Sequence, residues 1–134
     1  MQPKRQKYRK QFRGKRRGFA LRGSTVAFGE YGMKSLDRGW LAGNQIEAGR
    51  RAITNALKRK GRVWIRVFPD KPITARPAGQ RMGSGKGDVD RYVAVITPGR
   101  IIYEVAGVGE EQAREALRRA SDKMPFKTRI ITKN

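Results

Sequence analysis

The stretch from Pro77 to Asp90, PAGQRMGSGKGDVD, holds the residue types best suited to contact a charged ligand. Its glycines are interspersed with Arg81 and Lys86, and no apolar periodicity runs through it, so it is predicted to be a loop. Glycine lets a backbone approach another surface closely, and cations beside such a backbone favour phosphate groups. The alternative is a solvated linker, which would need neither the two cations nor Met82. The pattern therefore favours an RNA-facing loop.

The sequence GSGKG also resembles a nucleotide-binding loop, but the spacing does not fit. A phosphate-binding loop of the Walker type needs a glycine where Gln80 stands, and a Ser or Thr to hold magnesium where Gly87 stands. The dinucleotide fingerprint also fails, because Gly83, Gly85 and Gly87 follow a GxGxG spacing. A nucleotide-hydrolysing site is therefore not expected.

Catalytic chemistry has few candidate residues in this chain. It contains no cysteine and no histidine, which excludes disulfides, thiolate metal sites and the usual proton-transfer side chain. Asp88 and Asp90 flank the glycine-rich loop and have the chemistry to hold magnesium, so a small RNA-processing enzyme using them or Lys86 is an alternative. They fit better as turn residues paired with nearby cations. We expect no catalytic residue, no metal and no cofactor.

The charge balance points to a polyanionic partner. The 134 residues include 32 Lys and Arg but only 11 Asp and Glu, a net charge of +21. Nucleic acid is the default partner for such a surplus. A membrane partner is not expected, because the sequence has no apolar run long enough to span a bilayer and no lipidation motif. The N-terminus also lacks the apolar region of a secretory signal, and it lacks the serines and amphipathic stripe of a mitochondrial transit peptide.

The first 22 residues are predicted to be an extended RNA-binding tail. They contain no acid, repel themselves and cannot bury a core. On RNA, phosphates would neutralise the cations, and the interleaved Tyr8, Phe12 and Phe19 would stack on bases or fill crevices. A solvated tail that only aids solubility is the weaker alternative. The cations are Lys4, Arg5, Lys7, Arg9, Lys10, Arg13, Lys15, Arg16, Arg17 and Arg22.

The following segment predicts a hairpin and then a helix. Residues 24–37 show two short alternating pieces around a glycine-containing turn. Residues 44–60 carry a helical apolar stripe, with Asn44 and Glu47 at capping-box spacing and Gly61 as the terminating glycine. Gly49 falls on the apolar stripe, where it would let another element pack closely. Four cations of this helix are further candidate RNA contacts: Arg51, Lys58, Arg59 and Lys60.

The second half predicts strands and one more helix. Residues 62–68 alternate as a strand, and residues 91–97 and 100–106 are expected to form a hairpin around Thr97-Pro98-Gly99-Arg100. Residues 110–124 carry a helical apolar stripe that Pro125 ends, and residues 126–132 form a last strand. The fold class is α+β, with two helices on a mixed or antiparallel sheet. We expect a tail over 1–22 and one domain over 23–134, from which a loop protrudes over 77–90.

Five motifs together resemble the bacterial large-subunit ribosomal protein L-sixteen, the universal sixteenth large-subunit family. They are KRQKYRKQFRG, NQIEAGRRAI, WIRVFPDKPIT, RMGSGKG and GRIIYEVAGV, and they occur in the order and spacing of that family over essentially the whole chain. The pairing of WIRVFPDKP with RMGxGKG is highly specific. Ser84 departs from the common RMGKGKG and removes one lysine.

The resemblance implies an α/β-hammerhead type of fold and a structural role in the large ribosomal subunit. Implied partners are large-subunit rRNA, neighbouring large-subunit proteins and tRNA in the aminoacyl site, with the peptidyl site as a further candidate. A homo-oligomer is not expected, and the ribosome is expected to be cytoplasmic rather than organellar. A free-standing RNA chaperone is an alternative. The loop residues implied to contact rRNA and tRNA are Arg81, Met82, Gly83, Ser84, Gly85, Lys86 and Gly87.

Overall fold

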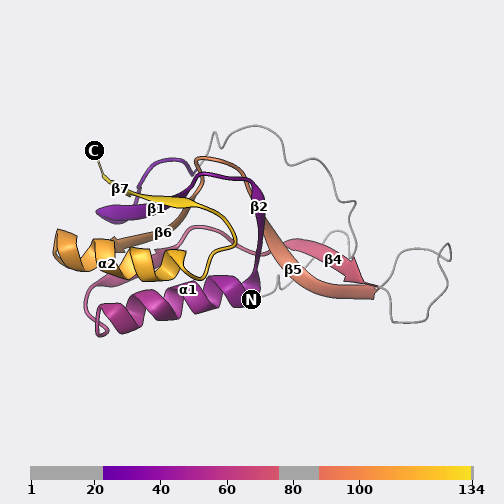
Figure 1. Ribbon diagram of the computed structural model, residues 1–134, viewed down its shortest axis with the longest axis horizontal. Coiled ribbons are helices and arrows are strands. Elements are labelled where there is room, and N and C mark those ends of the chain that lie inside the picture. Colours follow the sequence, from indigo (N-terminus) through magenta and orange to yellow (C-terminus); the bar gives the residue numbers. More distant parts are fainter. Residues whose placement is uncertain (1–22, 76–87, 134) are drawn as a thin grey trace.

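The computed structural model describes residues 23–75 and 88–133, which form two antiparallel sheets and two helices (Figure 1). The predicted α+β class is confirmed. One sheet has the strand order β3-β6-β1-β7 and the other β2-β5-β4. The elements are β1 (Tyr31–Ser35), β2 (Gly39–Ala42), α1 (Gly43–Ala56), β3 (Arg62–Ile65), β4 (Lys71–Ala75), β5 (Asp88–Ile96), β6 (Ile101–Ala106), α2 (Glu110–Ser121) and β7 (Thr128–Thr132).

Helices α1 and α2 lie side by side against one face of the four-stranded sheet (Figure 1). The predicted apolar stripes are confirmed, because Ile46 and Ile53 of α1 and Leu117 of α2 are fully buried. They meet side chains from the sheet such as Met33. Both helices end earlier than expected, and the predicted capping box is wrong. The start of α1 is instead capped by the Gln45 side chain, whose Oε1 accepts a hydrogen bond of 2.9 Å from the Ala42 amide.

Gly49 was predicted to permit a close approach, and the structure confirms it. The glycine is buried on the core side of α1, directly under the Tyr103 side chain from β6. The Tyr103 hydroxyl donates to the Ile46 carbonyl at 2.5 Å, one turn earlier in the helix. Burial raises the pKa of Tyr103, so the hydroxyl keeps its proton and remains a donor.

Strands β4 and β5 extend away from the helices as a narrow arm (Figure 1). They pair from Lys71 opposite Val93 to Ala75 opposite Asp88 at the tip, so residues 76–87 connect the two strands there. The predicted end of the loop at Asp90 is wrong, since residues 88–90 belong to β5. The predicted strand over 62–68 is also too long and stops at Ile65.

The predicted hairpin between residues 91–97 and 100–106 is wrong, because β5 and β6 lie in different sheets. The turn itself forms as expected: the Arg100 amide donates to the Thr97 carbonyl at 3.2 Å, and Gly99 has a φ of 95°. Ser35, at the end of β1, then holds the turn. Its amide donates to Arg100 O (2.9 Å), its hydroxyl to Thr97 O (2.8 Å), and its carbonyl accepts from Gly99 N (2.9 Å). The turn therefore serves as a corner between two sheets.

The hairpin expected over residues 24–37 does not form, because β1 pairs with β6 and β7. Residues 23–30 instead cross the face of the four-stranded sheet that is opposite the helices. Val26 is 8% exposed and packs over Gly32, where an added Cβ would lie only 2.8 Å from a Val26 methyl. Phe28 is 61% exposed, so the two side chains are not buried together.

The middle of the segment over residues 23–30 bonds to a side chain of β6. Its two ends bond to the β6 backbone, where Gly23 O accepts from the Ile101 amide (2.7 Å) and the Glu30 amide donates to Val105 O (2.9 Å).

Candidate nucleic-acid interface

Four exposed cations follow the end of α1: Lys58, Arg59, Lys60 and Arg62, here called the cationic turn. The helix ends in two interlocked hydrogen bonds. The Lys58 amide donates to Asn55 O at 3.2 Å, and the Arg59 amide to Thr54 O at 3.0 Å. This is the Schellman pattern, and it places Lys58 at the position that glycine usually occupies.

The backbone of the cationic turn is left-handed at non-glycine residues. Lys58 has a φ of 51° and Arg59 a φ of 64°, a conformation that costs about 1–2 kcal/mol for a side chain with a Cβ. The prediction that Gly61 terminates α1 is wrong. Gly61 (φ 74°) lies against the Ala106 carbonyl and turns the chain into β3. The turn thus holds cations at positions that backbone sterics disfavour.

No member of the cationic turn forms an ion pair with any residue in the described parts of the chain. Arg51, predicted as an RNA contact, differs: its Nε lies 3.4 Å from a Glu47 carboxylate oxygen, and Arg50 bonds the same carboxylate. The hydrogen bond from Arg50 lowers the pKa of Glu47 below its ordinary value. Arg51 is therefore partly neutralised, whereas the cationic turn keeps its full charge.

The exposed side of α2 has the opposite character. Its arginines bond acids along the same helix, including Arg114 to Glu110 (3.0 Å) and Arg118 to Glu115 (2.8 Å). Hydrogen bonds from Arg118 and Arg119 lower the pKa of Glu115 to about 2. Charge on α2 is thus internally balanced, so this helix offers no surplus of positive charge to RNA.

Glu104 of β6 fixes the segment through which the N-terminal tail joins the domain. Its Oε1 accepts hydrogen bonds from three successive amides, those of Ala27 (2.8 Å), Phe28 (2.9 Å) and Gly29 (2.9 Å). Its Oε2 pairs with Arg66, and the carboxylate is fully buried. Burial alone would raise the pKa of Glu104, but the amide and guanidinium hydrogen bonds outweigh it and hold the pKa below its ordinary value.

Most of the predicted site residues lie outside the described residues, namely the ten tail cations and the loop from Arg81 to Gly87. Of the predicted contacts on the first helix, the structure brings Lys58, Arg59 and Lys60 together and leaves Arg51 on the side of α1. The site prediction omitted Arg62, although the run KRKGR contained the signal for it. Within residues 23–75 and 88–133, no group of acids is placed to hold a metal ion, and no helix is long and apolar enough to cross a membrane.

These features define the class of protein as a strongly basic α+β domain whose unpaired cations suit a polyanionic surface. The chain belongs to the ribosomal protein L16p/L10e family, whose model matches residues 3–131. It is similar to the large ribosomal subunit protein uL16c of Gracilaria tenuistipitata and of Gracilaria tenuistipitata var. liui, each 57% identical over 133 residues. Those matches cover 99% of this chain and 98% of each relative.

Membership of this family makes the chain a structural constituent of the large ribosomal subunit and not an enzyme. As such it associates with rRNA and with other ribosomal proteins. The expectation of a cytoplasmic ribosome is wrong. Both relatives bear the name uL16c, which belongs to chloroplast ribosomal proteins and points to an organellar ribosome.

Proposed function

We propose that this constituent of the large subunit binds rRNA through two basic regions and helps to form the aminoacyl-tRNA site. The first region is the tail over residues 1–22, and the second is the cationic turn after α1. The loop over residues 81–87 is the tRNA-facing part. The domain over residues 23–133 is the scaffold that carries these parts.

The backbone of the cationic turn is the observation that carries rRNA binding. Lys58 and Arg59 adopt left-handed conformations that glycine would adopt without strain. A domain selected only for stability would place glycine at such a helix end. Phosphate binding explains why two long cations stand there with no acid beside them, since each phosphate contact releases counterions and adds affinity.

The arm of β4 and β5 supports the role of the loop. Ala75 and Asp88 pair at the tip of the arm, well away from the helices (Figure 1). Residues 76–87 are therefore attached at the tip of the arm, which projects farther from the helices than any other described part in this direction. A loop mounted on a two-stranded arm can contact a ligand while the basic regions hold the domain on rRNA.

The loop is tested with the double variant Arg81→Ala/Lys86→Ala in ribosomes. We expect folding and incorporation into large subunits close to wild type, because the core of the described residues is built without either residue. Affinity for aminoacyl-tRNA in the aminoacyl site should fall several-fold, since two cations near phosphate are lost. The matched control is Arg118→Ala/Arg119→Ala on α2, which removes the same charge. Normal tRNA affinity, peptide-bond formation and subunit maturation in the loop variant would refute the proposal.

A further inference from the structure

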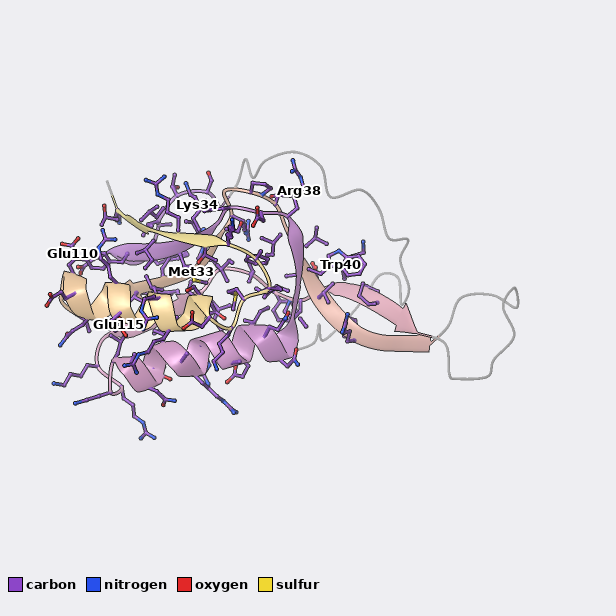
Figure 2. All side chains as sticks on the ribbon, viewed as in Figure 1. Met33, Lys34, Arg38, Trp40, Glu110 and Glu115 are labelled. Atoms are coloured by element: carbon purple, nitrogen blue, oxygen red, sulfur yellow. The ribbon has the colours of Figure 1, made fainter. Side chains whose placement is uncertain are left out.

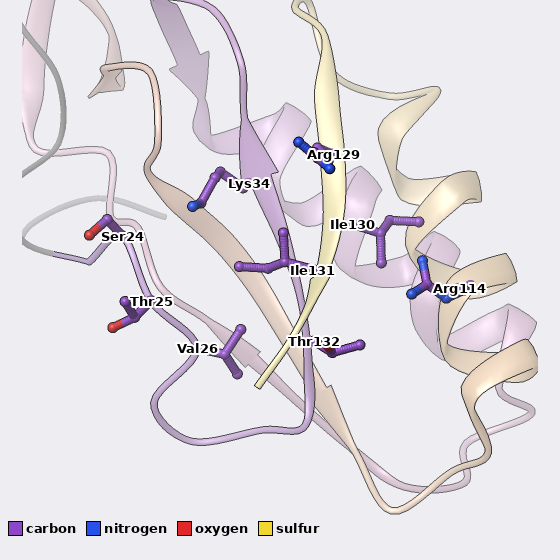
Figure 3. A pocket seen from close by; sticks show the side chains of 9 residues that line it. All are labelled: Ser24, Thr25, Val26, Lys34, Arg114, Arg129, Ile130, Ile131 and Thr132. Atoms are coloured by element: carbon purple, nitrogen blue, oxygen red, sulfur yellow. The ribbon is translucent and has the colours of Figure 1, made fainter. Parts of the chain in front are cut away.

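A groove runs along β7, the edge strand of the four-stranded sheet, and its lining includes Arg114 of α2 as well as residues on the face opposite the helices (Figure 3). It has a volume of about 640 Å³ and runs between residues 24–26 and strands β1 and β7. Lys34 lines it from β1, and Arg129 from β7. Met33, the neighbour of Lys34, points to the helices, whereas Lys34 points away from them (Figure 2). None of the residues that line the groove is acidic.

Two of the three cations that line the groove, Lys34 and Arg129, lie opposite each other, while the third, Arg114, is paired with Glu110 (3.0 Å). In the antiparallel pairing of β1 with β7, Lys34 is the register partner of Arg129, so their Cβ atoms are about 4.5–5.5 Å apart. Like charges in this position destabilise a sheet. Neither forms an ion pair with any residue that the structure describes. The free protein therefore carries an unfavourable pair that an anion between the two side chains would relieve.

We propose that this groove binds backbone phosphates of large-subunit rRNA. Lys34 and Arg129 are the cations, and the hydroxyls of Ser24 and Thr25, which also line the groove, are hydrogen-bond donors. Arginine can bond two oxygens of one phosphate, and lysine adds a point charge beside it. RNA is preferred to an acidic peptide because the chain carries a net charge of +21 and belongs to a ribosomal family.

The inference rests on the proposed rRNA binding and adds a contact on the side of the sheet away from the helices. It also gives a consequence for the tail. Residues 24–26 form one wall of the groove, so a phosphate bound there would sit beside the point where the tail enters the domain. The tail and the groove would then bind neighbouring parts of the same RNA.

Binding is tested with the full chain and a transcript of large-subunit rRNA over a range of salt concentrations. The variant Lys34→Gln/Arg129→Gln should bind more weakly, and its slope of log affinity against log salt should be less steep by about 1.5 units, as two lost phosphate contacts require. The control Arg118→Gln/Arg119→Gln removes equal charge from α2 and should keep the wild-type slope. If the groove variant and the control had the same slope, the groove proposal would be wrong, although the proposed rRNA binding would stand. If the wild-type protein showed no salt-dependent binding, the proposed rRNA binding itself would be wrong.

The variant Arg129→Glu separates binding from stability. It places a carboxylate opposite Lys34 and removes the like-charge pair, so the free protein should melt at a higher temperature. Its affinity for the rRNA transcript should nevertheless fall more than that of Arg129→Gln. A variant that melts higher yet binds as well as wild type would contradict the proposal.

A single introduced cysteine reports which molecule covers the groove, because the chain has no cysteine of its own. Ile131→Cys, in the groove wall, should react with maleimide in the free protein and more slowly once naked rRNA is bound. The protection should be lost when Lys34→Gln/Arg129→Gln is added. Protection that appears only in assembled subunits, and never with naked rRNA, would show that a neighbouring protein occupies the groove and would refute the proposal.

Discussion

Glu104 and Arg66 form an ion pair on the side of the four-stranded sheet that faces away from the helices. The carboxylate is fully buried, while the arginine side chain keeps 17% of its surface exposed. Arg66 also lies over the Phe28 ring, 5.0 Å from its centroid, and Phe28 stacks on Trp64. One buried acid thus joins β6, the chain after β3 and the segment that leads to the tail.

Replacing Glu104 by glutamine should destabilise the domain by about 2–4 kcal/mol. The variant leaves Arg66 without its charge partner and exchanges three charge-assisted amide hydrogen bonds for weaker ones. Urea denaturation followed by circular dichroism measures the change. The control Glu111→Gln removes an exposed acid of α2 and should change the free energy of unfolding very little. Equal stabilities of the two variants would mean that the Glu104 contacts contribute nothing net.

The same carboxylate makes stability depend on pH. Because the folded-state pKa of Glu104 lies below its ordinary value of 4.5, its contribution is complete above that value and is lost as pH falls through the folded-state pKa. The stability advantage of wild type over Glu104→Gln should therefore be constant near neutral pH and shrink in acid. Denaturation of both proteins between pH 7 and pH 3 measures this difference. An advantage that grows on acidification would contradict a lowered pKa.

Gly49→Ala should destabilise the protein, although alanine normally favours a helix by about 1 kcal/mol over glycine. The new methyl group would overlap the Tyr103 hydroxyl and press on Met124, and overpacking of this kind costs about 1–3 kcal/mol. Removing the hydroxyl makes room, so Gly49→Ala should cost less in a Tyr103→Phe background. A double-mutant cycle of unfolding free energies tests this coupling. Additive effects would show that the two residues do not constrain each other.

The helical faces were predictable because burial of Ile53 and Leu117 follows from local periodicity. Strand pairing was not. The turn at Thr97-Pro98-Gly99-Arg100 forms as its residues dictate, yet its hydrogen bonds with Ser35 direct β5 and β6 into different sheets. A local turn motif indicates that the chain reverses or bends, but it does not indicate which strands become neighbours.

The candidate site was predictable to a similar extent. The sequence after the first helix shows that this turn is basic. Its left-handed backbone, however, depends on how the helix end meets Gly61 and Ala106. The pairing of Lys34 with Arg129 joins residues far apart in sequence, and no short motif reports it. Likewise, the three amides bound by Glu104 lie 75 to 77 positions away from it. Contacts of this range are set by topology, which one sequence does not display.

Two substitutions at Lys58 should separate the cost of its backbone from the value of its charge. Lys58→Gly relieves a left-handed conformation and should stabilise the free domain by about 1 kcal/mol, whereas Lys58→Gln keeps the strain. Both remove one cation and should weaken rRNA binding by a similar factor. Thermal melts and filter binding provide the two readouts. If Lys58→Gly bound rRNA as tightly as wild type, the cationic turn would not be a phosphate contact.

The central claim is that the chain is held on large-subunit rRNA mainly by its basic regions. The most direct test compares the full chain with a version lacking residues 1–22, measuring affinity for a large-subunit rRNA transcript against salt concentration. If about six of the ten tail cations meet phosphates, the truncated chain should show a slope of log affinity against log salt that is less steep by about 4–5 units. An unchanged slope, with equal affinity at every salt concentration, would contradict the account.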